Sequence, residues 1–150
     1  MPVALQDLGL AVKRLQHRHH RTLDALLGEQ GTTLVQWDAL RAIHRHPDST
    51  SHELALLTFQ SDQSFGTLAK RLLALGLIER TAGPGRAIRH RLNPAGEAVL
   101  DNGRAVVDRV LAESFAPLSP QERDLLHSLL MRLLPDQGGR DTDGHQVPTD

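Results

Sequence analysis

Apolar residues recur every three or four positions along most of the chain, with one interruption near its middle. This spacing predicts a long helix over residues 3–29 and a second helix that ends at His46-Pro47, because proline cannot continue a helix. After the interruption the same spacing returns over residues 94–115 and again over 119–134. The pattern therefore predicts a mainly helical protein whose middle segment differs.

The interruption, residues 50–92, begins with two short helical patterns. Thr50 and Glu53 fit a capping box, in which each side chain bonds the backbone amide of the other residue. The second pattern is expected to begin near Ser61 or Asp62, whose side chains suit the position before a helix. Two short helices joined by a polar break are therefore expected here.

A hairpin is expected after these two helices. Gly76 is placed to end the second of them in a left-handed conformation. Residues 77–81 and 88–92 then read as strands around the glycine-proline-glycine turn at 83–85. Helix, turn, helix and hairpin in this order are typical of a winged helix-turn-helix, which sets its second helix in the major groove of DNA.

The polar face of the second short helix carries side chains that suit such a groove. Hydroxyls and amides bond base edges, while lysine and arginine bind phosphate or guanine. Residues 59–93 hold six basic and two acidic side chains, a difference of +4 in a chain whose net charge is -1. A solvated helix face beside an ordinary hairpin would have a similar composition, but the order of the elements favours DNA. We expect base contacts from Ser61, Gln63, Ser64 and Thr67, phosphate contacts from Lys70, Arg71 and Arg89, and a minor-groove contact from Arg86 at the hairpin tip.

The other face of this helix is expected to pack into the core. Gly66 is expected to let the helix approach a backbone closely, although glycine costs about 1 kcal/mol against alanine inside a helix. The apolar residues expected on this face are Phe65, Leu68, Ala69, Leu72, Leu73 and Leu75.

Several short pieces of the chain match one known family in order. The pieces are Glu53-Leu54-Ala55, Lys70-Arg71-Leu72 running into Gly76-Leu77-Ile78-Glu79-Arg80, Arg86-Ala87, and Leu92-Asn93-Pro94-Ala95-Gly96. Together they resemble the MarR family of bacterial transcription regulators, over residues 5–134. The resemblance implies a homodimer formed by the first and the last two helices. It also implies a tip arginine at Arg86, although Gly85 stands where the family wing usually carries a supporting aspartate.

One domain is expected over residues 1–134, with a DNA-binding lobe at about 33–93 and dimerisation helices at about 3–29 and 94–134. Leucine makes up six of the sixteen residues of the last helix, too many to bury against one neighbour, so a partner subunit is expected to cover them. Residues 135–150 lack an apolar period and are expected to form a disordered tail.

Composition excludes several other classes of protein. The chain has no cysteine, so it has no disulfide framework, thiolate metal site or thiol redox sensor. It has no run of about 18 apolar residues and no signal pattern, so no membrane partner and a cytoplasmic location are expected. The chain has three phenylalanines, one tryptophan and no tyrosine, which are few aromatic side chains for a module that binds RNA by stacking on its bases. No nucleophile–base constellation or phosphate loop stands out, so neither an enzyme nor a cofactor is predicted.

The nine histidines raise the question of a metal site, for example His17 and His20 with His44 or His46. Neighbouring arginines repel cations, so no metal is predicted. A solvated basic surface remains one interpretation, and an anion pocket for a carboxylate or phenolate is the other. That pocket would comprise Arg14, His17, Arg18 and Arg21 with Trp37, Arg41 and His44, although tryptophan at such a position is more often part of the core. The family resemblance implies a small aromatic acid as its effector.

The favoured hypothesis is a dimeric repressor that binds a pseudo-palindromic DNA operator and is released by a small anionic or phenolic effector. The alternative hypothesis is a winged-helix ligand-binding or protein-interaction module without operator binding. The short wing and the net charge of -1 motivate this alternative.

Overall fold

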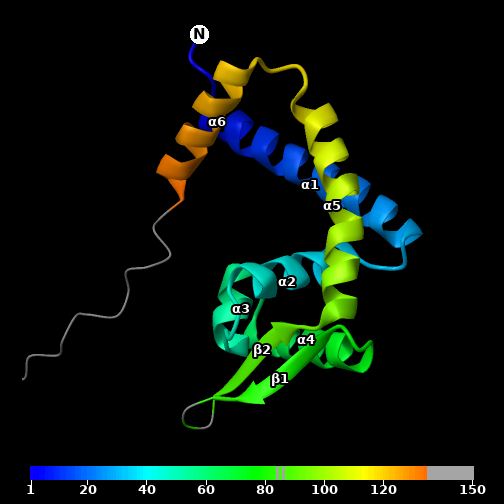
Figure 1. The fold of residues 1–150 in the computed structure, drawn as a ribbon. Coiled ribbons are helices and arrows are strands. Elements are labelled where there is room, and N and C mark those ends of the chain that lie inside the picture. Colours follow the sequence, from blue (N-terminus) through cyan, green and yellow to red (C-terminus); the bar gives the residue numbers. More distant parts are fainter. Residues whose placement is uncertain (84, 86, 135–150) are drawn as a thin grey trace, which may run out of the picture. The chain divides into compact units, whose positions relative to one another are not determined.

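The computed structural model describes residues 1–83, 85 and 87–134 of the 150-residue chain. Figure 1 shows the helices and the single hairpin in chain order. The described elements are α1 (Leu5–Glu29), α2 (Leu34–Arg45), α3 (Ser51–Leu57), α4 (Asp62–Ala74), β1 (Ile78–Ala82), β2 (Ile88–Leu92), α5 (Pro94–Phe115) and α6 (Pro120–Leu133). The predicted mainly α class with a small β-hairpin wing is confirmed, and the predicted disordered tail lies outside the described residues.

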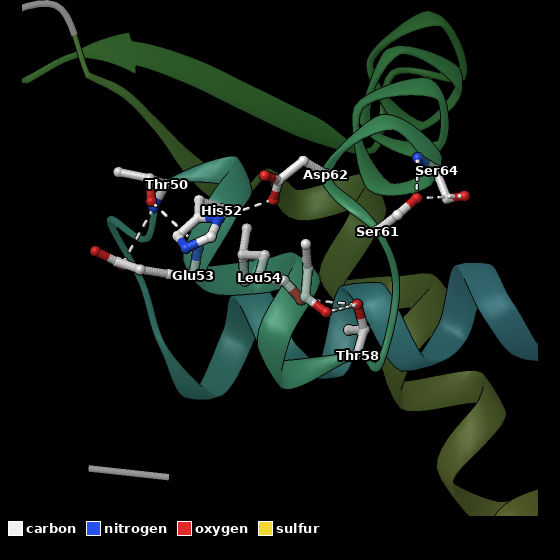
Figure 2. A network of polar contacts seen from close by, with 9 residues as sticks. Thr50, His52, Glu53, Leu54, Thr58, Ser61, Asp62 and Ser64 are labelled. Carbon is white, nitrogen blue, oxygen red and sulfur yellow. Dashed lines mark hydrogen bonds and ion pairs between the residues drawn. The ribbon is translucent and has the colours of Figure 1, made fainter. Parts of the chain in front are cut away.

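The helix starts follow from local capping. Thr50 accepts from the backbone amide of Glu53, and the Glu53 carboxylate accepts from the amide of Thr50, each at 3.3 Å. Ser61 accepts from the amide of Ser64 at 3.1 Å and so begins α4. These contacts, drawn in Figure 2, satisfy amides that have no partner within their own helix, and they confirm the starts predicted for α3 and α4.

Three helices end with a residue in the left-handed conformation. Gly31 after α1 and Gly76 after α4 have φ angles of 84° and 71°. Phe59 after α3 has a φ of 57°, and its amide donates to Leu56 in the same manner as Gly76 donates to Leu73. A phenylalanine therefore occupies a position that favours glycine.

The core lies within the unit formed by residues 1–114, one of two compact units of the chain. Helices α1 to α5 each contribute a fully buried side chain to it: Leu27, Leu40, Leu54, Phe65 and Leu100. Trp37 is only 3% exposed, and its indole N–H donates to the carbonyl of Leu100 at 3.1 Å. The interpretation of Trp37 as a core residue is thus confirmed.

Two expectations for α4 need correction. Leu73 and Leu75 are 41% and 43% exposed, so they are not part of the buried face. At 3.6 residues per turn they lie about 80° to either side of Phe65, at the edges of the apolar stripe. Gly66 does not serve a close approach within the described chain, because nothing lies within 4 Å of where its Cβ would be.

The hairpin is antiparallel, with Ile78 opposite Leu92 and Ala82 opposite Ile88. The segment before α3 joins its other edge through a bridge between Ser49 and His90. This arrangement holds the wing against the loop between α2 and α3 and next to α4, as Figure 1 shows.

The second unit contains α6, and none of the described residues of α6 is buried. Its exposed apolar side chains are Leu125, Leu129, Leu130, Met131 and Leu133. None of the described helices has the length and apolar character needed to cross a lipid bilayer.

Candidate nucleic-acid interface

The polar side of α4 is presented to solvent on a rigid support. On the opposite side of the helix Phe65, Ala69 and Leu72 are fully buried. The helical period places the exposed residues within about 120° of one another, so they form one surface. These residues are Gln63, Ser64, Thr67, Lys70 and Arg71. Their exposure is what insertion into a DNA groove requires.

The hydroxyls at the start of α4 bond one another. Ser61 accepts from the Ser64 amide and donates to the Ser64 hydroxyl at 3.0 Å. Thr67 donates to the carbonyl of Gln63 at 3.1 Å. Ser61 therefore has a structural role as helix cap, and its contact with a base stays a prediction, as do those of Ser64 and Thr67.

A side-chain contact that the sequence did not predict joins the starts of the two short helices. His52 Nδ1 lies 2.8 Å from the Asp62 carboxylate, and both side chains are exposed. Figure 2 shows the two side chains facing each other across the gap between α3 and α4. The signal was available, because both residues lie one or two positions after predicted helix caps, and the starts of these two helices lie close together in a helix-turn-helix.

The base of the wing is held by arginines bound to Asp48. Arg91 donates to both oxygens of the Asp48 carboxylate, at 2.6 and 2.5 Å, and Arg89 donates to the Asp48 carbonyl at 2.9 Å. The hydrogen bond from Arg91 lowers the pKa of the Asp48 carboxyl, and Asp48 in turn raises the pKa of the arginine. Asp48 lies outside the window whose charge was counted as +4, so it offsets part of that charge.

This arrangement changes what can be expected of the wing arginines. Arg89 is half-buried and anchors the wing, so a phosphate contact from its remaining donors stays a prediction. Arg86, predicted to enter the minor groove, lies outside the described residues. The wing is nevertheless fixed relative to α4, which a combined contact with DNA needs.

His90 connects the wing to α4. It is 1% exposed, its Nδ1 lies 2.9 Å from the Ser49 carbonyl, and its ring meets the Phe65 ring edge-on at 6.3 Å. Burial lowers the pKa of His90, Arg80 adds to the effect, and the hydrogen bond to Ser49 opposes it. The imidazole is therefore neutral at pH 7, with its proton on Nδ1 so that it can donate to Ser49.

The predicted effector residues fall into two groups. Those of α1 line a common cavity of about 750 Å³ together with Lys13 and Leu10. Those of α2 lie elsewhere: Trp37 is in the core, Arg41 lies over the Trp37 ring at 5.5 Å, and His44 is 3.1 Å from Glu97. The structure thus brings together Arg14, His17, Arg18 and Arg21 but not Trp37, Arg41 and His44.

No metal site is visible in the part of the chain that the structure describes. There, no three histidine, aspartate or glutamate side chains gather as metal coordination would need.

Two short helices, a wing bound to the second of them, and an exposed cationic face define the winged helix-turn-helix class of proteins.

Comparison with known proteins identifies the family within this class. The sequence profile of the MarR family matches residues 30–87. The HTH-type transcriptional repressor Rv2887 of Mycobacterium tuberculosis is 30% identical over 110 residues, covering 71% of this chain and 79% of that protein. The chain belongs to the MarR family of transcriptional regulators, whose members are transcription factors rather than enzymes.

Solved structures agree with this assignment. A probable transcriptional regulator from Pseudomonas aeruginosa is 32% identical, with a TM-score of 0.76 over 87% of this chain and 100% of that chain. Rv2887 in complex with p-aminosalicylic acid is 26% identical, with a TM-score of 0.70 over 84% of this chain and 97% of that chain. A mutant of MarR from E. coli, complexed with operator DNA, is 23% identical and has a TM-score of 0.79 over 86% and 94% of the two chains, which supports the fold.

Proposed function

We propose that the protein is a dimeric transcriptional repressor that binds a pseudo-palindromic operator through α4 and the wing. The observation that carries the proposal is the exposed polar and cationic face of α4, set on a fully buried opposite face. Lys70 and Arg71 supply phosphate contacts, and Gln63, Ser64 and Thr67 read bases. The apolar side chains exposed on α6 provide the surface for a second copy.

A small anionic or phenolic effector would release the DNA. The cavity along α1 supports this part of the proposal, because it combines five cationic or histidine side chains with apolar surface from Leu10 and Ala25. Rv2887 has been crystallised with salicylic acid and with p-aminosalicylic acid. Two recognition helices must fit successive major grooves about 34 Å apart, so a small rotation caused by the effector suffices for release.

The alternative is a ligand-binding or protein-interaction module without operator binding. It is favoured by the engagement of two wing arginines, Arg89 and Arg91, with Asp48. It is also favoured by the net charge of -1. Both features reduce the positive potential available to DNA.

The salt dependence of DNA affinity distinguishes the two functions. Fluorescence anisotropy with duplex DNA from upstream of its own gene should show specific binding. The logarithm of the association constant should fall linearly with the logarithm of the salt concentration. Replacement of Lys70 or Arg71 by glutamine should reduce that slope by about 1, since each removes one phosphate contact. Arg109→Gln, which removes an exposed charge from α5, is the matched control and should leave the slope unchanged. Absence of sequence-specific binding at low salt would favour the alternative.

A further inference from the structure

The contact between His52 of α3 and Asp62 of α4 is not required by helix capping or by core packing. Thr50 and Ser61 cap the two helices, and neither His52 nor Asp62 is buried. Nδ1 of His52 lies 2.8 Å from the Asp62 carboxylate, and the two side chains are 68% and 69% exposed. An exposed pair of this kind adds little to stability, so its position is the reason to look for a second role.

That position is where a duplex would contact the motif. Asp62 is the first residue of α4, and the first turn of the second helix of a helix-turn-helix meets base edges. The first helix of the motif crosses the sugar-phosphate backbone beside it. His52 belongs to the first turn of α3, and Figure 2 shows its ring facing Asp62 across the gap between the helices. With α4 in the groove, the imidazole would therefore lie beside a phosphate.

The charged and titratable side chains on the elements packed against α3 leave Asp62 as the partner that faces His52. On α3 itself, the Glu53 carboxylate accepts from the Thr50 amide. Those of α2 lie around the other end of α3 and the turn after it, and are Asp38, Arg41, Arg45 and His46. Those of β2 bond the segment before α3, and are Arg89, His90 and Arg91.

The contact with Asp62 decides what the second ring nitrogen of His52 can do. An ionised carboxylate only accepts hydrogen bonds, so Nδ1 must carry the hydrogen of this contact. A neutral imidazole has a single ring hydrogen, so its Nε2 is then an acceptor. A phosphate oxygen also accepts, and the neutral ring therefore cannot bond a phosphate while it bonds Asp62. The imidazolium has a hydrogen on each nitrogen and can bond both partners.

We propose that His52 binds a phosphate of the operator through Nε2 and takes up one proton from solvent as it does so. Asp62 acts as a positioning residue, because it orients the ring and occupies Nδ1. The protonated ring then lies between two anions, the carboxylate and the phosphate, which favours its charged form. Because binding takes up a proton, DNA affinity rises as the pH falls. This inference rests on the proposed function, since the phosphate belongs to the duplex.

Fluorescence anisotropy with the upstream duplex at constant salt, from about pH 8 to about pH 6, tests the proposal. The association constant of the unmodified protein should rise at least about tenfold over this range, since each chain takes up a proton. His52→Gln cannot titrate and should lose most of this rise. His52→Arg is charged at every pH in the range and should bind at the upper pH about as tightly as the unmodified protein does at the lower one.

Asp62→Asn separates positioning from a simple effect of charge. The amide of this variant can donate to Nδ1 as well as accept from it, so a neutral ring with its hydrogen on Nε2 can bond the phosphate. The rise in affinity should therefore be smaller, whereas loss of a negative charge alone would raise affinity by the same factor at every pH. His44→Gln is the matched control, because it breaks another exposed histidine–carboxylate contact, 3.1 Å from Glu97, that joins α2 to α5. It should keep the full rise.

An equal rise in the unmodified protein and in His52→Gln would overturn the proposal and leave DNA binding through α4 intact. An affinity that does not increase as the pH falls would do the same. Absence of specific binding at every pH would instead contradict the proposed function together with this inference. Calorimetry in two buffers of different ionisation enthalpy counts the protons directly, and His52→Gln should take up fewer than the unmodified protein. Thermal unfolding at each pH verifies that every variant is folded.

Discussion

At the scale of single residues, the backbone angle and the room for a side chain decide what each position tolerates. Phe59 and two glycines of helices α4 and α5 illustrate this most clearly. Gly66 has open space where its Cβ would be, whereas a Cβ on Gly103 would overlap the Trp37 indole. The same substitution should therefore have opposite effects at these two helical sites.

The two glycines give a matched pair of variants. Gly66→Ala should stabilise the protein by about 1 kcal/mol, because alanine is the better helix former and meets no obstacle. Gly103→Ala should destabilise it, because the Trp37 ring must move from a buried site where it bonds Leu100. Urea unfolding followed by tryptophan fluorescence measures the change in stability of both variants. Equal effects of the two substitutions would contradict the described packing.

Phe59 gives a second comparison. Phe59→Gly should raise the free energy of unfolding by about 1 kcal/mol, because glycine adopts the left-handed conformation without strain. Phe59→Ala removes the ring as well but keeps a Cβ, so it should give little or none of this gain. A loss of stability in Phe59→Gly, measured by thermal unfolding, would mean that the ring contributes to folding after all.

At the scale of elements, the sequence predicted what depends on neighbours in the chain. The starts of α3 and α4 could be read from Thr50 and Ser61, because a cap bonds amides two or three residues away. The anchoring of the wing could not be read from the sequence, because Asp48 and Arg91 are 43 positions apart and meet only after the hairpin has folded. The predicted effector residues of α1 likewise share one cavity while Trp37 lies in the core, since spacing along helices does not show which faces meet.

The wing should respond to pH through His90. Because burial lowers the pKa of His90 in the folded protein, the unfolded chain takes up a proton at this position first as the pH falls. The contribution of His90 to stability is therefore present above its unfolded pKa of about 6.5 and is lost as the pH falls below that value. His19, whose pKa is also lowered by burial, acts in the same direction.

Urea unfolding at pH 7.5 and 5.5 measures this dependence. His90→Asn keeps a donor for the Ser49 carbonyl but cannot titrate, so its loss of stability between the two values should be smaller than that of the unmodified protein. His127→Asn, at an exposed position of α6, is the control and should retain the full loss. An identical loss in all three proteins would show that His90 is not the group responsible.

At the scale of the whole molecule, one copy of the chain leaves apolar side chains of several helices exposed to solvent. The unit that contains α6 exposes a set of leucines, and the first unit exposes Leu5 and Leu8 of α1. Groups of exposed apolar side chains are typical of interfaces, and a second copy of the chain would cover them. A dimer would also present two copies of α4 to one duplex, which a single copy does not.

The most direct test is the number of chains bound to one duplex, measured by sedimentation of the protein with its upstream DNA. We predict two chains per duplex and a preference of at least about 1,000-fold over a scrambled duplex of the same composition. A single bound chain, or equal affinity for both duplexes, would contradict it.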